Sequence, residues 1–194
     1  MAGVVRNAVY DRFAWFYSRG WGTEYHRQAL GVLEKLLLAG APAGARLLDV
    51  CCGTGDLART LSERGYRVTG LDSSEPMLGF ARRNAPAARF VLADAREFRL
   101  AGVFHGAVST FDSLNHVLTV EELERVFRNV HGALVKGGVW VFDLNMAESF
   151  RTLWAGAGFA QIERREAREL GMHGDIALGR SFFRARKPEE DEAQ

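Results

Sequence analysis

The chain has 194 residues, of which 47% are hydrophobic and 25% are charged, a composition that suits a single globular domain with its own core. Its formal net charge of +1 and the lack of a dense block of Lys and Arg exclude a strong general attraction to nucleic acid or to an anionic membrane. No stretch approaches the roughly 18 apolar residues of a membrane span, and the N-terminal residues lack the apolar core of a secretory signal, so we expect a cytoplasmic protein.

Two amphipathic helices are predicted ahead of the first strand. They cover residues 11–17 and 24–39, and the second ends at the stop signal Gly-Ala-Pro-Ala-Gly. The first predicted helix and the residues that flank it are denser in aromatic side chains than a surface helix needs. This density indicates either a packed helix or a cover over a ligand site.

Short apolar strands and amphipathic helices alternate from residue 46 onward. Strands are predicted at 46–50, 66–71, 89–93, 103–111 and 137–144, and helices at 56–64, 75–84 and 119–134. The strands are apolar without interruption, which is typical of a parallel sheet covered on both faces. Two further strands, at 158–167 and 181–187, predict a closing antiparallel hairpin with a mobile connection at 171–179. The expected fold is α/β, with a doubly wound, mostly parallel, seven-stranded sheet and helices on both faces.

Polar residues follow each of the first four predicted strands. Asp49 ends the first strand ahead of the turn Cys-Cys-Gly-Thr-Gly, Asp72 follows the second, Asp94 the third, and the segment 111–116, Phe-Asp-Ser-Leu-Asn-His, the fourth. In a doubly wound fold the carboxyl ends of the strands share one rim, and ligands bind there. We therefore expect these residues to lie around one site.

The glycine turn is ambiguous by itself. Gly53, Gly55 and Ala58 satisfy the GxGxxG/A pattern of dinucleotide-binding folds, and Asp72 lies where the ribose-binding acid of an NAD site is expected, so an NAD-linked oxidoreductase is one alternative. Asp49, however, suits an ammonium or sulfonium group better than a pyrophosphate. A ligand with an amino acid at one end, a ribose in the middle and adenine at the other would use all three strand-end acids.

Four motifs, in this order and with this spacing, resemble those of the class I S-adenosylmethionine (SAM) dependent methyltransferases of the small-molecule type. They are LLDVCCGTG (47–55), VTGLDSS (68–74), LADAR (92–96) and STFDSLNH (109–116). The likeness extends over residues 10–187. Cys51 departs from the commonest form of the first motif, which often has a glycine there; similar cysteine variants occur in quinone-biosynthesis methyltransferases.

The resemblance implies a Rossmann-like methyltransferase fold that binds SAM, releases S-adenosylhomocysteine and methylates a small-molecule acceptor, with no nucleic-acid or membrane partner. It implies an N-terminal helical cap over the cofactor site at residues 1–40, a SAM-binding catalytic core at 41–187 and a disordered tail at 188–194. No metal is expected, and Cys51 and Cys52 are interpreted as small residues in a tight turn.

The matching positions predict where each part of the cofactor lies. The residues expected at its methionine end are Asp49, Cys51, Gly53, Gly55 and Phe111, with Tyr10, Tyr17 and Trp21 closing over it. The residues expected at the ribose and adenine are Asp72, Ser73, Met77, Asp94 and Ala95.

A sulfonium methyl group is already activated, so transfer by in-line displacement requires mainly that the acceptor is held close and water is kept out. His116 is the candidate general base, with Asp112 and Asn115 as orienting groups.

Relatives with this fourth motif commonly carry a substrate-covering insertion after the fifth strand, whereas residues 146–159 predict a helix directly. Three readings stay open: an open acceptor site, a homodimer whose second copy covers it, or a SAM-binding module with little turnover.

Overall fold

The computed structural model describes residues 8–20, 23–145 and 157–189. The strands are β1 (Arg46–Val50), β2 (Arg67–Asp72), β3 (Arg89–Leu92), β4 (Phe104–Ser109), β5 (Leu134–Leu144), β6 (Ala160–Glu166) and β7 (Ser181–Arg186). The α-helices are α1 (Ala8–Tyr17), α2 (Thr23–Leu36), α3 (Asp56–Glu63), α4 (Glu75–Asn84) and α5 (Val120–Ala133). Short 3-10 helices are η1 (Leu38–Gly40), η2 (Ser113–His116) and η3 (Asp175–Ala177).

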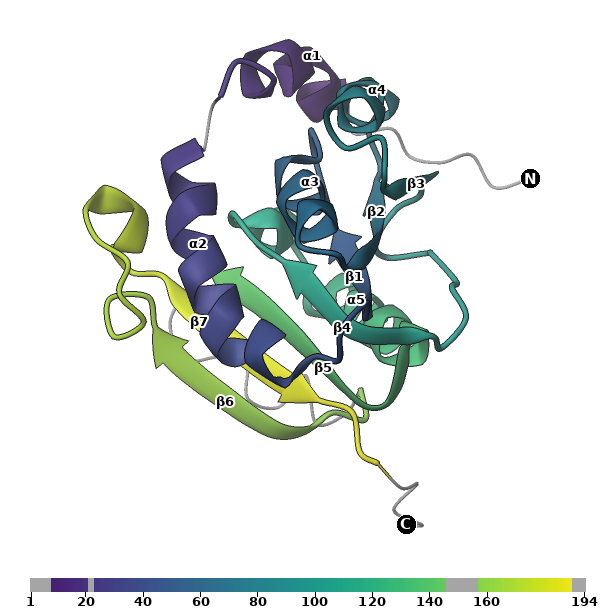
Figure 1. The fold of residues 1–194 in the computed structure, drawn as a ribbon, viewed down its shortest axis with the longest axis vertical. Coiled ribbons are helices and arrows are strands. Elements are labelled where there is room, and N and C mark those ends of the chain that lie inside the picture. Colours follow the sequence, from purple (N-terminus) through teal and green to yellow (C-terminus); the bar gives the residue numbers. More distant parts are fainter. Residues whose placement is uncertain (1–7, 21–22, 146–156, 190–194) are drawn as a thin grey trace.

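The seven described strands form one sheet in the order β3-β2-β1-β4-β5-β7-β6 (Figure 1). The first five along the sheet are parallel, and β7 pairs antiparallel with β5 on one side and with β6 on the other. The predicted fold class is confirmed. The strand order reverses between β1 and β4, which is where a doubly wound sheet opens a crevice for a ligand.

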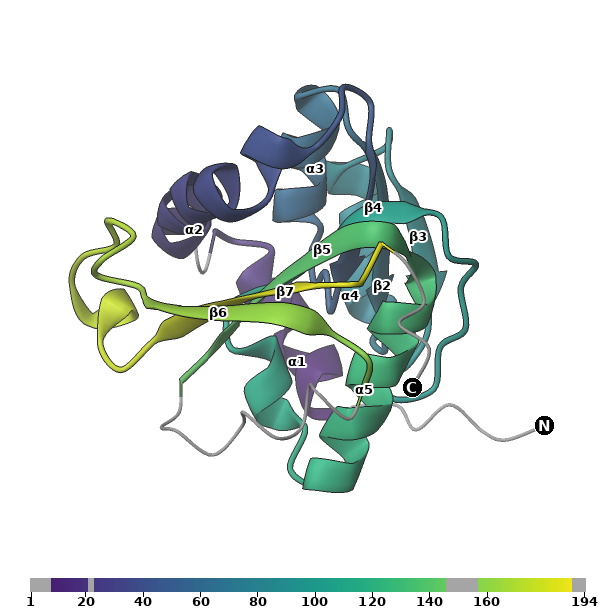
Figure 2. The same ribbon diagram turned by 90° about the horizontal axis from the view of Figure 1, so that it is seen from below.

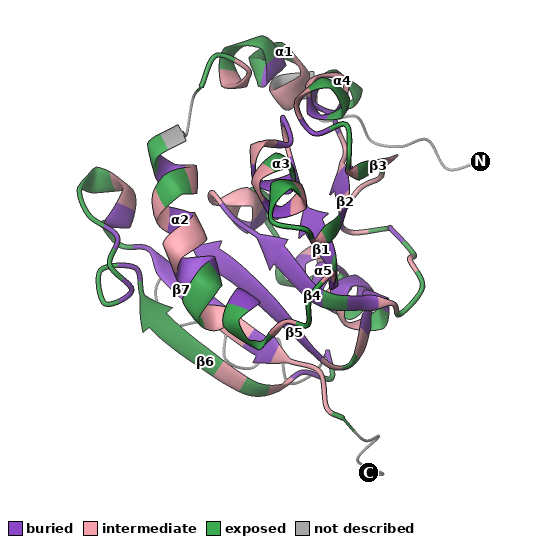
Figure 3. Cartoon of the chain, in the orientation of Figure 1, coloured by how far each residue is buried: buried purple, intermediate pink, exposed green. Residues whose placement is uncertain are grey.

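Helices cover both faces of this sheet (Figure 2). On one face Leu33 of α2 and Leu61 of α3 pack with Val108 and Phe182 of the strands. On the other face Phe127 of α5 packs with residues of β5, among them Trp140. The central strands are buried along most of their length (Figure 3), which accounts for their uninterrupted apolar sequences.

The boundary between α5 and β5 differs from the prediction. The helix was expected to run to residue 134 and the strand to start at 137, but Leu134 is already extended and pairs with Phe104 of β4. Gly137 takes a φ of +74°, and the register between β4 and β5 shifts at this end of the pairing. The hydrophobic periodicity does not reveal this boundary, because an apolar residue such as Leu134 fits the buried face of a helix and a buried strand equally well.

Helix α1 lies over the carboxyl ends of the strands, next to α4 (Figure 1). Ser74 joins the two helices, because its hydroxyl donates to Oδ1 of Asp11 at 2.6 Å and also caps α4 by accepting the N–H of Met77 at 3.3 Å. Helix α2, in contrast, is part of the layer that packs on the sheet. None of the described helices is long and apolar enough to span a membrane.

Candidate active site

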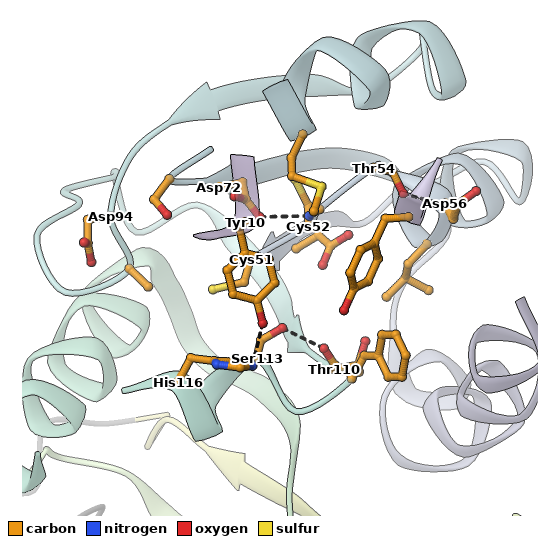
Figure 4. Close-up of a pocket in the computed structure, with 18 of the residues that line it drawn as sticks. Tyr10, Cys51, Cys52, Thr54, Asp56, Asp72, Asp94, Thr110, Ser113 and His116 are labelled. Carbon is orange, nitrogen blue, oxygen red and sulfur yellow. Dashed lines mark hydrogen bonds between the residues drawn. The ribbon is translucent and has the colours of Figure 1, made fainter. Parts of the chain in front are cut away.

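A cleft of about 350 Å³ opens at the rim where β1 to β4 end (Figure 4). Of the predicted site residues, those that line it are Tyr10, Tyr17, Asp49, Cys51, Gly53, Asp72, Ser73, Met77, Asp94, Ala95, Phe111 and His116. Gly55 is not part of the lining, and Trp21 and residues 146–156 of the predicted helix lie outside the described residues. Residues 50 or more apart in the sequence are thus brought to one cavity.

The glycine turn after β1 takes left-handed backbone conformations. Cys51 has a φ of +63° and Gly53 a φ of +53°. Glycine takes such angles freely whereas a side chain is disfavoured there, so Cys51 is strained where glycine would be relaxed. Gly55 has a φ of +79°, and a Cβ atom there would lie 2.9 Å from Cα of Ala81 in α4. Gly55 is therefore needed for the turn and for the close packing of α3 on α4.

Both cysteines of this turn are free. Burial raises the pKa of Cys51 and of Cys52 well above the ordinary thiol value, with nearby carboxylates adding to it. The thiols stay protonated at neutral pH and are poor nucleophiles. The interpretation of both as small structural residues fits this environment.

Asp72 organises the rim. Its Oδ2 accepts the N–H of Gly53 at 2.9 Å and its Oδ1 accepts the N–H of Ser74 at 2.9 Å, so one carboxylate joins the glycine turn to the end of β2. Burial raises the pKa of Asp72, and these backbone hydrogen bonds oppose the rise. Each oxygen keeps a second lone pair for a ligand hydroxyl.

Asp49 is the most unusual group in the cleft. Its side chain is 3% exposed, and its Oδ2 is buried without a hydrogen-bond partner. Burial, with Asp72 nearby, raises its pKa to about 7. A buried carboxylate oxygen without a donor is costly, and a ligand cation or N–H group at this place would remove the cost. The ammonium group of SAM fits this requirement.

The charge of the lining also favours a cation. Among the described residues that line the cleft, the only Lys or Arg is Arg96, against the carboxylates of Asp49, Asp56, Asp72 and Asp94. Because like charges repel strongly in a partly dry cavity, a pyrophosphate beside Asp49 and Asp72 is disfavoured, whereas an ammonium and a sulfonium are attracted.

Asp94 has a partner that the sequence interpretation missed. Arg96 donates to both of its oxygens, from Nε to Oδ1 at 2.9 Å and from Nη2 to Oδ2 at 2.6 Å, and also to Glu122 of α5 at 2.8 Å. Burial alone would raise the pKa of Asp94, but the hydrogen bonds from Arg96 outweigh it and the pKa lies below its ordinary value. The carboxylate is held ionised and oriented at the edge of the cleft.

Aromatic side chains border the cleft beside the β4–η2 loop. The hydroxyl of Tyr10 lies 2.5 Å from Nε2 of His116, and Figure 4 shows the two side chains meeting. Burial is the main cause of a raised Tyr10 pKa, so this hydroxyl keeps its proton and can donate to Nε2 of His116. The ring of Phe111 stacks on Tyr25 with 4.4 Å between centroids, and Tyr17 meets it edge-on at 6.2 Å.

Neither predicted orienting group lines the cleft. Asp112 is bound to Arg180, with Nη2 to Oδ2 at 2.7 Å, and Oδ1 of Asn115 accepts the N–H of Asn145 at 3.2 Å. Both side chains instead fix the loop that carries His116.

The cleft is also lined by residues to which the sequence gave little or no weight: His26, Cys52, Thr54, Asp56, Leu57, Arg96, Thr110, Ser113 and Val117.

His26 is the most informative of these additional residues. It comes from α2, some twenty residues before the first motif, and its Nδ1 is buried without a partner among the described residues. Burial lowers its pKa, so the ring is neutral at pH 7. The sequence gives no signal for this residue other than its place next to Tyr25 on the packed face of the helix.

Residues 47–138 match the family model described as "Methyltransferase domain". A dTDP-3-amino-3,4,6-trideoxy-alpha-D-glucopyranose N,N-dimethyltransferase of Streptomyces venezuelae is 34% identical over 163 residues, which cover 84% of this chain and 65% of that protein. Residues 47–138 thus form a methyltransferase domain. A dTDP-3-amino-3,6-dideoxy-alpha-D-glucopyranose N,N-dimethyltransferase of Streptomyces fradiae is a second such relative, 35% identical over 64% of this chain and 49% of its own length. This methyltransferase thus spans about half to two thirds of the length of these relatives.

Solved structures show the same fold for this methyltransferase. SAM-bound CalS10, an amino pentose methyltransferase from Micromonospora echinaspora, superposes with a TM-score of 0.68 at 23% identity, over 87% of this chain and 94% of that one. A TehB-like SAM-dependent methyltransferase from Corynebacterium glutamicum also gives a TM-score of 0.68, at 24% identity over 90% and 98% of the two chains. In the part of the chain that the structure describes, no group of three or more His, Cys, Asp or Glu is arranged to hold a metal ion.

Proposed function

We propose that this methyltransferase transfers the methyl group of SAM to a small-molecule acceptor by in-line displacement. The observation that carries the proposal is the buried, unpartnered Oδ2 of Asp49 in a cleft with an excess of carboxylates at the strand ends. Bound SAM supplies a methyl group that is already activated on a sulfonium, so the chain needs no nucleophilic side chain.

Each part of the cofactor has candidate partners in the cleft. Asp49 would pair with its ammonium group, and Asp72 would accept hydrogen bonds from the ribose hydroxyls. Asp94, held ionised by Arg96, would accept from the adenine amine, and Met77 would supply apolar contact to the ring. These assignments follow the family motifs, and the lining of the cleft supports them.

The acceptor would bind against Tyr10, Tyr17, Phe111 and His116, whose rings limit the access of water. We propose that, as the new bond forms, the Tyr10 hydroxyl leaves Nε2 of His116 and this nitrogen takes up the proton of the acceptor. The two relatives described above are named for N,N-dimethylation of amino sugars carried on a nucleotide. An amine on a small molecule is therefore the acceptor class that we propose.

Calorimetric titration with SAM, S-adenosylhomocysteine and NAD tests the cofactor. We expect micromolar binding of the two sulfur ligands and no heat from NAD, because a pyrophosphate would meet the carboxylates of the cleft. Binding of NAD alone would replace this proposal with a nucleotide-linked oxidoreductase. Tight SAM binding without turnover on a panel of amines would indicate that the protein is a SAM-binding module with little methyltransferase activity.

The substitution His116→Gln is expected to lower kcat by about 100- to 1,000-fold while the Kd of SAM changes less than about threefold. Glutamine can still accept a hydrogen bond from the Tyr10 hydroxyl, but it cannot take up the proton that the methylated substrate releases. Transfer of a radiolabelled methyl group under single-turnover conditions measures the effect. His131→Gln is the control, because His131 packs edge-on against Phe159, with 5.1 Å between ring centroids, and does not line the cleft. Equal rates for the two variants would remove His116 from the reaction.

A further inference from the structure

A buried ionic cluster lies behind the acceptor side of the cleft. Arg180, just ahead of β7, donates to Asp112 from Nη1 to Oδ1 at 2.9 Å and from Nη2 to Oδ2 at 2.7 Å, and it is hydrogen-bonded to Asp143 of β5. Arg180 is 5% exposed and Asp143 is fully buried. Tyr25 of α2 completes the cluster, since its hydroxyl donates to Asp143 at 2.7 Å and Cζ of Arg180 lies 4.8 Å from its ring centre.

The cluster holds a strained turn. Phe111 and Asp112 take φ values of +65° and +59°, and two successive non-glycine residues in this region strain the backbone. The N–H of Phe111 donates to the Tyr25 hydroxyl at 2.8 Å, and the N–H of Asp112 donates to Oδ1 of Asp143 at 3.2 Å. Both backbone donors of the strained turn, and the side chain of Asp112, are therefore bound by the cluster.

This turn decides where two cleft residues lie. It turns the Phe111 ring onto Tyr25 and starts η2, which carries Ser113 and His116 to the cleft. None of Tyr25, Asp112, Asp143 or Arg180 lines the cleft itself. These four residues can therefore affect the cleft only through the turn at residues 111–112.

We propose that Arg180 is a positioning residue that locks the 111–112 turn and so places Phe111 and His116 against the acceptor. The proposal rests on the function proposed above. Arg180 suits the task because a guanidinium binds a carboxylate through two fixed hydrogen bonds and so sets its direction as well as its distance.

Stability alone is a weak reason for such a cluster. Burying one guanidinium with two carboxylates costs desolvation that their attraction roughly offsets, and apolar side chains of similar size often stabilise a fold as well or better. The hydrogen bonds of the cluster converge instead on a turn that no apolar side chain could hold in the left-handed region. The geometry therefore points to placement of the loop.

Arg180→Met in the full chain, without ligand, tests this inference by amide exchange and NMR. We expect the protection of the Phe111 and Asp112 amides to fall at least tenfold, while the amides of β4 keep theirs. The His116 ring signal should also move, because Tyr10 meets this ring edge-on at 5.1 Å only while the loop is in place. The His131 signal, set by Phe159, serves as the internal reference.

Arg184→Met is the matched control, since Arg184 on β7 donates to the carbonyl of Leu36, outside the cluster. With SAM and an accepted amine, Arg180→Met should lower kcat about 10- to 100-fold and leave the Kd of SAM within about threefold. A folded Arg180→Met protein with a lower Tm but unchanged loop amides and His116 signal would overturn the proposal.

If Arg180→Met does not fold, Asp112→Asn serves instead, because it removes the negative charge and leaves one acceptor oxygen in place of two while Arg180 stays on Asp143. This variant must shift the His116 signal in the same direction, and an unshifted signal overturns the proposal. The exchange and NMR readouts need no methyl donor. Failure of the proposed function, by contrast, would appear as a lack of SAM binding by the unmodified chain.

Discussion

Replacing Asp49 by Asn is expected to weaken SAM binding strongly and, at the same time, to stabilise the ligand-free protein. In the unfolded chain this carboxyl has a pKa of about 3.9, whereas burial raises it to about 7 in the fold. The folded state thus holds the proton more tightly, so ionised Asp49 costs stability, and the cost grows between about pH 4 and pH 7. Asparagine removes this cost, and we expect the free energy of unfolding at pH 8 to rise by about 2–4 kcal/mol.

Urea denaturation at pH 5 and pH 8 measures this gain, which should be smaller at pH 5 because less of the cost has accumulated there. Asp175→Asn, at an exposed position in η3, is the control and should change stability little at either pH. A loss of stability in Asp49→Asn would show that the carboxylate has a partner in the fold.

The binding side of this prediction has its own pH signature. Asp49 must be ionised to pair with an ammonium group, so the affinity of the unmodified protein for SAM should rise from pH 6 to pH 8 with release of a proton. In Asp49→Asn the Kd should be at least about 100-fold higher, in line with the loss of a buried charge pair. Calorimetry in two buffers of different ionisation enthalpy measures the proton release. The same pH dependence in both proteins would contradict the role assigned to Asp49.

Asp72→Ala is expected to weaken SAM binding at least about 100-fold but, unlike Asp49→Asn, to destabilise the fold. The N–H groups of Gly53 and Ser74 donate hydrogen bonds to Asp72, so the substitution leaves both without their acceptor. Ser74 is fully buried. Leaving buried donors unpaired costs about 1–3 kcal/mol. Thermal unfolding together with SAM titration measures both effects.

The matched variant for this test is Asp72→Asn, which keeps one carbonyl acceptor and should lie between Ala and the unmodified protein in stability. The two cleft acids thus have opposite expected effects on stability, although either substitution impairs binding. If Asp72→Ala bound SAM as the unmodified chain does, Asp72 would not be a ribose ligand.

The sequence alone determined the layout of this methyltransferase. The uninterrupted apolar strands and the amphipathic helices between them predicted a parallel sheet, because such a strand is stable only when both faces are covered. Acids at the carboxyl ends of strands, such as Asp49 and Asp72, predicted the rim of the site, because parallel strands end on one side. These signals are local, so a single sequence carries them.

Only the tertiary structure decided what each side chain does at that rim. Gly55 satisfies a binding motif, and its close approach to Ala81 is a packing requirement that a spacing pattern does not record. Asp94 is held by Arg96, and Arg96 is held in turn by Glu122 of α5, 26 residues beyond Arg96, so the state of Asp94 depends on a helix that is distant in the sequence. Asp112 is withdrawn from the cleft by Arg180, 68 residues away. Oδ2 of Asp49 is buried without a hydrogen-bond partner because of how its neighbours pack. Burial and hydrogen-bond partners are decided only when segments that are distant in the sequence come together.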